Sequence, residues 1–543
     1  MNPVLAAVGW TVGGLLLVVV VTGLSRRVGW SAPLVLVAVG VIAAIPDWTP
    51  TVRLDPDVVL AGVLPALLFA AALQTSFLEV RSRGDSILTL SVGLVLFTVL
   101  AVGLATWWLV PGIPPALGFA FGAIVAPTDA VSVGAIAGSG RLPRRLASLL
   151  EGEGLLNDAT ALVALNTAIF AISTPGFGLP RVLGDFAVAV LGGLGVGIVV
   201  AAVLVQVRRR LRAPVLDTSI SLATPYVAYV PAAVIGGSGF LAVVLTGIWM
   251  GYRAPSFQSA ESRVAERLNW RTVSFLLENA VFLLIGLQLP SIVASIGDTG
   301  IGIGQGVLII AGLYLAMVLA RFLWVYGATV LYRLGPEVLR ERRWDWRTAF
   351  AISFAGVRGV VTLAAVFLLP PGAGPAVGFL QLAAFVIVVV SLLQGIAVAP
   401  LVKRLRLPLP NPEQDRVQIR TLIAEAQAAA LHRLETEATE DDPVDLVTSL
   451  RSSAEYRVGI AQTDEQGLAS QPDAYARLRL LMLDSERRAV LDARREGRYE
   501  ETVISAVLGD FDTIETALKR SYRRDLRQAP KPPLALARLR RRD

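Results

Sequence analysis

The sequence predicts an all-α polytopic membrane protein with thirteen transmembrane helices, followed by a helical soluble tail. Its 543 residues are 54% hydrophobic and only 17% charged, and the mean hydropathy is +0.63. A transmembrane helix needs about 20 mostly apolar residues, and such runs follow one another almost without pause up to residue 407. The chain has no cysteine and one histidine, His432, so any proton handling inside the membrane must use carboxylates.

The distribution of basic residues supports the number of spans through the positive-inside rule. Loops that would share one side of the membrane contain 23 Lys or Arg residues, whereas the loops of the other side contain Arg53 and Arg181. We therefore expect a multi-pass protein of the cytoplasmic membrane, with its N-terminus outside and its C-terminus in the cytoplasm. The predicted spans are 4–24, 31–46, 57–78, 86–110, 115–138, 147–173, 182–207, 216–235, 238–252, 272–290, 303–332, 347–369 and 376–399.

Composition divides the chain into two predicted domains. Residues 1–407, the transmembrane domain, hold 27 Lys or Arg against 18 Asp or Glu, and residues 408–543 hold 22 against 24. The net charge of +7 therefore belongs to the membrane part, where lipids are the expected partners, and a nucleic-acid partner is not expected. The charged tail has helical spacing, which predicts a helical domain, and its position after the last span places it in the cytoplasm, where a regulatory role is expected.

Two of the predicted spans contain helix-breaking residues. Thirteen spans leave six before and six after a central helix, and the second six would start from the opposite side of the membrane. This predicts an inverted repeat in which span 5 corresponds to span 12. In span 5, Pro127 removes an amide donor and interrupts the helix. In span 12, Gly356 and Gly359 loosen the helix around Arg358. Broken helices occur at membrane depth where they line a cavity or are buried in protein, so the two breaks predict a site.

Span 6 carries four polar residues, Glu151, Glu153, Asn157 and Asp158. An ionised side chain costs about 2.5–3.5 kcal/mol at the centre of a membrane helix, so a charge kept there is a candidate functional group. Helical side chains lean toward the N-terminus, which places the Asp158 carboxylate over Gly154, where a water or a small cation would fit. Carboxylate, amide and carbonyl oxygens suit a hard cation. We predict that Asp158, beside Asn157, binds either a proton or a cation.

The break in span 5 adds Thr128 and Asp129 to the candidate site. Both are predicted to ligate the cation or to support its ligands, so that Na⁺ would be held by Asp158 and Asp129. The alternative is that Asp129 caps the helix that follows the break.

The other intramembrane charges are predicted to be paired or solvated. A buried ionised group needs a partner, and Glu153 is the best candidate for Arg358, which would tie span 6 to span 12. Glu151 lies nearer the cytoplasmic end and is expected to be solvated. Arg321 in span 11 is expected to neutralise the C-terminus of a half-helix or to pair with Glu278 in span 10.

The sequence lacks the motifs that ATP-driven transport or hydrolysis would require. The chain contains neither a phosphate-binding Gly-x-x-x-x-Gly-Lys-Ser/Thr loop nor a Gly-x-Ser-x-Gly nucleophile motif. We therefore expect no enzymatic activity and no cofactor beyond the transported ions. Transport would be driven by an ion gradient.

Three motifs resemble the signatures of NhaP/NHE-type sodium/proton antiporters. They are Ala-Pro-Thr-Asp-Ala-Val (126–131), Glu-Gly-Leu-Leu-Asn-Asp (153–158) and Gly-Val-Arg-Gly (356–359). The stretch Phe-Leu-Leu-Ile-Gly-Leu-Gln-Leu (282–289) also looks like part of that family. The resemblance spans the whole predicted membrane domain.

This resemblance implies an NhaA-like antiporter fold in a homodimer, with spans 5 and 12 crossing at their breaks and an elevator-like movement. It implies exchange of intracellular Na⁺ or Li⁺ for external protons, in the service of pH homeostasis. It also assigns Asp158, Asn157, Asp129 and Thr128 to the ion site and pairs Glu153 with Arg358. An Asn at 157 resembles the electroneutral branch, because electrogenic relatives carry a second Asp there.

The sequence departs from the family pattern at two positions. Many members have Ser where this chain has Gly154, and many have Glu where it has Ala70. Potassium/proton exchange by the same fold is therefore kept as an alternative. A cation channel and a non-transporting receptor acting through residues 408–543 are further alternatives from other classes.

Overall fold

Every regular element that the computed structural model describes is a helix, and no strand occurs in the described part of the chain. The described residues are 3–46, 58–75, 77, 84–129, 143–173, 179–211, 213–294, 301–334, 344–407, 412–438 and short stretches between 442 and 515. The chain divides into two compact units, Met1–Pro410 and Asn411–Asp543. The second unit begins with α20 (Pro412–Glu437), and its regulatory role stays a prediction.

Each predicted span contains at least one described helix. The first six contain α1 (Pro3–Val28), α2 (Ala32–Ala43), η1 (Val58–Val63) with α3 (Leu64–Gln74), α5 (Gly84–Leu88) with η2 (Thr89–Gly93) and α6 (Leu94–Leu109), α7 (Pro115–Val125), and α9 (Arg144–Ser173). The others contain α10 (Leu179–Arg208), α11 (Pro214–Val234), α12 (Gly239–Phe257), α13 (Ala260–Ala294), α14 (Ile303–Leu334), α16 (Trp346–Phe354) with α17 (Val360–Ala365) and η4 (Val366–Leu368), and α18 (Ala376–Ile396), which α19 (Val398–Arg404) follows.

Seven of the described helices are long and apolar enough to cross a membrane by length and composition. They are α1, the α5–α6 segment, α9, α10, α13, α14 and α18. Shorter apolar helices include α2, the η1–α3 segment and α7. The full number of thirteen crossings, the inverted repeat and the orientation of the termini stay predictions.

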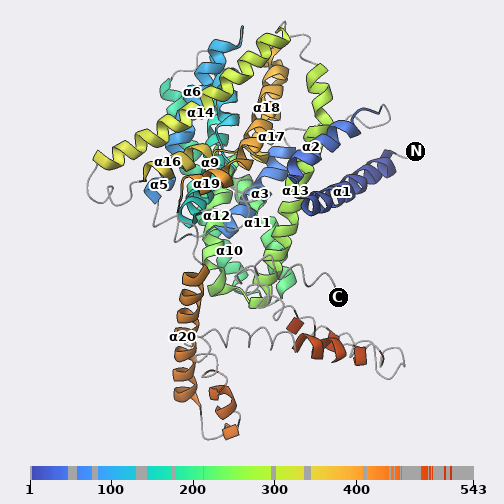
Figure 1. Cartoon of the computed structure of the whole chain (residues 1–543), viewed down its shortest axis with the longest axis vertical. Helices are drawn as coiled ribbons and strands as arrows, with labels where there is room; N and C mark the ends of the chain where they lie inside the picture. The colour runs from blue at the N-terminus through green and yellow to red at the C-terminus, as the bar shows by residue number, and fades with distance from the viewer. Residues whose placement is uncertain are drawn as a thin grey trace. The chain divides into compact units, whose positions relative to one another are not determined.

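The helices around the predicted breaks pack closely. Helix α7 packs against α6 and α9, and α14 packs against α6. Figure 1 shows α6, α9 and α14 in the same part of the unit. A Cβ atom at Gly122 would lie 2.6 Å from the carbonyl oxygen of Val99 and 2.9 Å from the amide nitrogen of Gly103, so only glycine permits this approach of α7 to α6. On the other side of the unit, α13 packs against α1 and α2, and α12 packs against α3, α10 and α11.

Both predicted breaks are present. Helix α7 ends at Val125, and residues 126–129 are not helical. Helix α16 ends at Phe354, and α17 begins at Val360 after a non-helical stretch. The continuation of span 5 at residues 130–142 lies outside the described residues.

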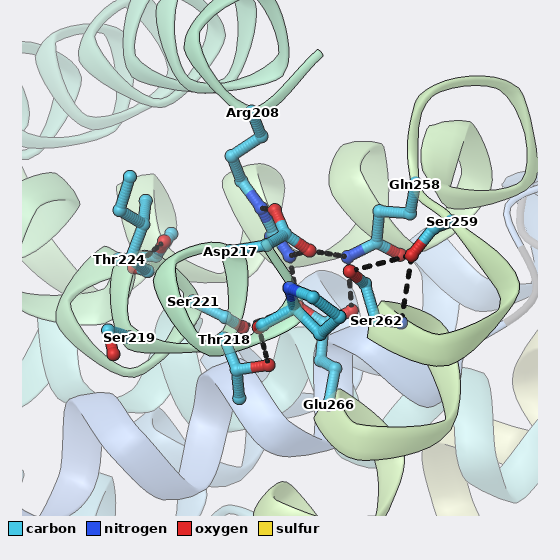
Figure 2. Close-up of polar contacts among 12 residues, drawn as sticks. Arg208, Asp217, Thr218, Ser219, Ser221, Thr224, Gln258, Ser259, Ser262 and Glu266 are labelled. Atoms are coloured by element: carbon cyan, nitrogen blue, oxygen red, sulfur yellow. Dashed lines mark hydrogen bonds and ion pairs between the residues drawn. The ribbon is translucent and has the colours of Figure 1, made fainter. Parts of the chain in front are cut away.

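A buried ionic network joins the neighbouring ends of α10, α11, α12 and α13 (Figure 2). Arg208 at the end of α10 donates to Asp217 in α11 (2.6 Å) and to Glu266 in α13 (2.9 Å). Gln258, just after α12, donates to both acids, at 3.2 and 2.9 Å, and Ser221 donates to Glu266. The network holds the first turns of α13, the helix whose later turns reach the site described below.

Candidate functional site

The two breaks contact each other through the main chain. The amide of Asp129 donates to the carbonyl oxygen of Val357 at 2.7 Å. At the same place the Asp129 carboxylate packs against Gly359, where any Cβ atom would overlap it. The Asp129 side chain and the break of span 12 are therefore fitted to one another.

Arg358 connects the breaks through carbonyl groups. Its Nε donates to the carbonyl oxygen of Val125 at 2.9 Å, and its Nη1 donates to that of Gly356 at 2.5 Å. Val125 is the last residue of α7, and the final carbonyls of a helix have no partner inside the helix and carry its negative dipole end. The buried guanidinium thus satisfies and neutralises the end of α7, while its own amide donates to Ser391 Oγ of α18 at 3.0 Å.

Glu153 of α9 is paired with Arg321 of α14. Two hydrogen bonds of 2.5 and 2.9 Å join the two side chains, which are 1% and 3% exposed. The predicted pairing of Glu153 with Arg358 is therefore wrong, because α14 packs close enough for Arg321 to reach α9. Arg321 Nε also donates to the carbonyl oxygen of Ile352, in the last turn of α16, at 3.1 Å. Arg321 thus lies at the C-terminus of a half-helix, one of the two positions predicted for it, and no ion pair between Arg321 and Glu278 occurs in the described part of the chain.

Thr128 and Asn157 extend this ion pair to the break of span 5. The Thr128 hydroxyl donates to Glu153 Oε1 at 2.7 Å. Asn157 Nδ2 donates to the hydroxyl and the carbonyl of Thr128, at 2.9 and 3.1 Å. The chain Arg321–Glu153–Thr128–Asn157 is buried throughout, so these groups fix the non-helical stretch in place.

A cavity of about 630 Å³ opens beside this chain of hydrogen bonds. Its wall includes Asp129 and Thr128 from the break, Asp158 from α9, Glu278 from α13 and Thr362 from α17. Within the described part of the chain, no hydrogen bond or ion pair holds the carboxylate of Asp158 or of Glu278. The cavity therefore brings carboxylate oxygens from three elements to one space.

The structure separates the four predicted polar groups of α9. Asp158 is half-buried and faces the cavity, whereas Glu153 and Asn157 are buried in the hydrogen-bond chain. The Glu151 side chain is exposed, and neither it nor Gly154 belongs to the described lining of the cavity. The described lining of the cavity includes Asp158 and Gly359 of the break in span 12, and the space over Gly154 stays a prediction.

Thr362 and Ser391 are polar groups of this region that the sequence prediction missed. Both lie in apolar runs, where a hydroxyl gives no charge signal. Thr362 directly follows the Gly-Val-Arg-Gly break in the sequence, which could have marked it as a candidate. Ser391, which accepts a hydrogen bond from the break, had no comparable signal. The acids of the Arg208 network were also missed, although Asp217 follows one arginine-rich loop and Glu266 lies within another.

Broken helices that meet at an acid-lined cavity, among long apolar helices, define a multi-pass membrane protein of the ion-transporter class. Residues 14–404 match the family model described as sodium/hydrogen exchanger, transmembrane. The chain belongs to the sodium/hydrogen exchanger family, which confirms the resemblance.

Individual relatives agree with this assignment. An uncharacterised Na⁺/H⁺ exchanger of Mycobacterium tuberculosis is 31% identical over 517 residues, covering 92% of this chain and 94% of the relative. A sodium, potassium, lithium and rubidium/H⁺ antiporter of Bacillus subtilis is 33% identical over 349 residues, covering 62% of this chain and 52% of the relative. The structure of a sodium proton antiporter from Methanocaldococcus jannaschii has a similar fold, with a TM-score of 0.59 and 19% identity over 74% of this chain and 99% of that one.

Proposed function

We propose that the protein exchanges Na⁺ or Li⁺ for H⁺ across the cytoplasmic membrane, with Asp158 as the group that binds the two ions in turn. The observation that carries this proposal is the contrast within α9. Glu153 is neutralised by Arg321, and Asn157 is committed to Thr128, whereas Asp158 faces the cavity with Asp129 nearby in its wall. A carboxylate that is accessible to the cavity and has no fixed cation is suited to exchange one bound cation for another.

The transport cycle follows from competition at one carboxylate. With Asp158 ionised, its oxygens and those of Asp129 and Thr128 attract a dehydrated monovalent cation. A proton on Asp158 removes that negative charge and releases the cation. Exchange is tightly coupled when the site reorients only with one of the two ions bound.

The proposal extends to stoichiometry and assembly. The amide of Asn157 leaves one titratable carboxylate in the 157–158 pair, which supports exchange of one cation for one proton without net charge movement. The N-terminus outside, the elevator-like movement and the homodimer come from the positive-inside count and the family resemblance. They are part of the proposal.

Potassium/proton exchange is the second candidate. It is favoured by the Bacillus subtilis relative, whose name includes potassium and rubidium beside sodium and lithium. The same fold and the same carboxylate would serve either cation, so the two candidates differ in the size of the ion accepted.

Everted membrane vesicles test both candidates. Wild-type vesicles with a preformed pH gradient are expected to lose it when Na⁺ or Li⁺ is added, and Asp158→Asn vesicles are expected to keep it. Normal exchange by Asp158→Asn would refute the role of Asp158. Adding K⁺ in place of Na⁺ distinguishes the second candidate, and a current that persists under voltage alone would identify a channel instead.

A further inference from the structure

Thr362 has a buried hydroxyl group that no partner satisfies. The residue is 1% exposed, and its Oγ1 makes no hydrogen bond in the described structure. It lies in the third position of α17, immediately after the break that contains Arg358. Buried hydroxyls are normally hydrogen-bonded, so this one calls for an explanation.

Hydroxyl groups elsewhere in the membrane unit follow a different pattern. Buried threonines commonly donate to the carbonyl four residues earlier in their own helix, and five that do so are Thr98, Thr106, Thr160, Thr224 and Thr329. For Thr362 the carbonyl four residues earlier belongs to Arg358, in the non-helical stretch. The break that creates the site therefore also removes the usual partner of this hydroxyl.

Thr362 also belongs to the lining of the cavity described above. Thr362 lines it together with Asp158 from α9 and with Thr128 and Asp129 from the opposite break. A threonine oxygen carries two lone pairs and no charge, and oxygen ligands of this kind replace the hydration shell of a hard cation. The cavity lining thus brings Thr362 from the second broken helix together with Asp129 from the first and Asp158 from α9.

We propose that the Thr362 hydroxyl oxygen is a ligand of the transported alkali cation and helps to set which cation is accepted. This inference rests on the proposed function, because it assigns a ligand to the same site. A small cation such as Na⁺ or Li⁺ costs more to dehydrate than K⁺ and interacts more strongly with each oxygen that replaces a water molecule, because the charges approach more closely. Removal of one neutral oxygen weakens binding of the small cations most, and it leaves proton binding by Asp158 in place.

The test is cation-dependent exchange by full-length protein in everted vesicles, with Thr362→Val, Thr362→Ala and Thr362→Ser. Valine has nearly the shape of threonine without its hydroxyl, alanine covers the case in which valine does not fit, and serine restores the hydroxyl. Thr98→Val is the matched control, because the Thr98 hydroxyl is equally buried but is bonded to the carbonyl of Leu94 at 2.7 Å. Na⁺, Li⁺ and K⁺ are titrated separately, and the KM and the maximal rate are measured for each.

The valine and alanine variants are expected to raise the KM for Na⁺ and Li⁺ by about fivefold to tenfold, with a smaller change for K⁺. The serine variant and Thr98→Val should keep wild-type values. Unchanged KM values in the valine and alanine variants, or an equal loss of maximal rate for every cation, would overturn the role of Thr362. Absence of exchange by the wild-type protein would instead refute the proposed function itself, so the two failures are distinguishable.

Discussion

The Glu153 carboxylate and the Arg321 guanidinium form a two-bond ion pair between α9 and α14, with distances of 2.5 and 2.9 Å. Both side chains are almost completely buried. When one partner of such a pair is removed, the other is left as an uncompensated buried charge, at a cost of about 3–5 kcal/mol. We therefore expect Glu153→Gln and Arg321→Gln each to lower the thermal stability of the purified protein strongly.

A double variant identifies the partner of Glu153. Glu153→Gln combined with Arg321→Gln leaves no unpaired charge and should recover much of the lost stability, because the coupling of contacting residues makes their effects non-additive. Glu153→Gln combined with Arg358→Gln should lose more stability than either single variant. If stability recovered in the variant with Arg358→Gln and not in the variant with Arg321→Gln, Arg358 and not Arg321 would be the partner of Glu153.

Gly359→Ala is predicted to impair exchange. Its Cβ atom would overlap the Asp129 carboxylate, so either Asp129 or the break of span 12 must shift. Overpacking of this kind costs about 1–3 kcal/mol, and a misplaced ligand lowers the exchange rate by about tenfold or more. Gly327→Ala in α14, where nothing lies within 4 Å of the added atom, should exchange normally. Equal rates for the two variants would contradict the fit of Asp129 against Gly359.

The exchange kinetics should show competition between protons and sodium. One carboxylate that binds either ion makes the apparent KM for Na⁺ rise as the pH falls, by up to about tenfold per pH unit. The maximal rate at saturating Na⁺ should change much less over the same range. Initial rates in proteoliposomes at several pH values measure both quantities. A fall in maximal rate at constant KM would indicate that protons act elsewhere than at the cation site.

The ionic network of Arg208 at the helix ends predicts that two neighbouring arginines contribute very differently to the stability of the protein. Arg208→Gln leaves two buried acids, Asp217 and Glu266, without their cation and is expected to destabilise the protein by about 3–5 kcal/mol. Arg209→Gln changes an exposed side chain and should alter stability by no more than about 0.5 kcal/mol. Thermal unfolding of the two purified variants compares them directly. Similar unfolding temperatures would show that the network adds little.

Local chemistry made part of the site predictable from the sequence. Pro127 and the glycines at 356 and 359 restrict or loosen the backbone wherever they occur, so both breaks could be placed before any packing was known. The free-energy cost of a charge in an apolar helix likewise identifies Glu153 and Asp158 as candidate functional residues, whichever residues they contact. The helix-breaking residues and the intramembrane charges can both be recognised from residues close together in the sequence.

The partners depend on how the helices pack, which the sequence pattern does not contain. Arg321 and Arg358 are both lone cations in apolar spans, and either has the reach to pair with Glu153. The rotation and height of α14 decide between them. In the same way, Thr362 differs from Thr98 and the other threonines that bond four residues back because the helix before it has ended, so its hydroxyl could not be singled out by residue type.

The two breaks are joined by the main-chain hydrogen bond between Asp129 and Val357 and by the hydrogen bond from Arg358 to the carbonyl of Val125. These hydrogen bonds bear on whether the cation meets the same site from both sides of the membrane. Peptide groups that are bonded to each other move together, so the oxygens of the two breaks would accompany the cation as one assembly. An ion arriving from the cytoplasm and one arriving from outside would then meet the same ligands. The ligands themselves would give the cation the same contacts on both sides, so any difference in affinity between the two sides would come from the helices around the site.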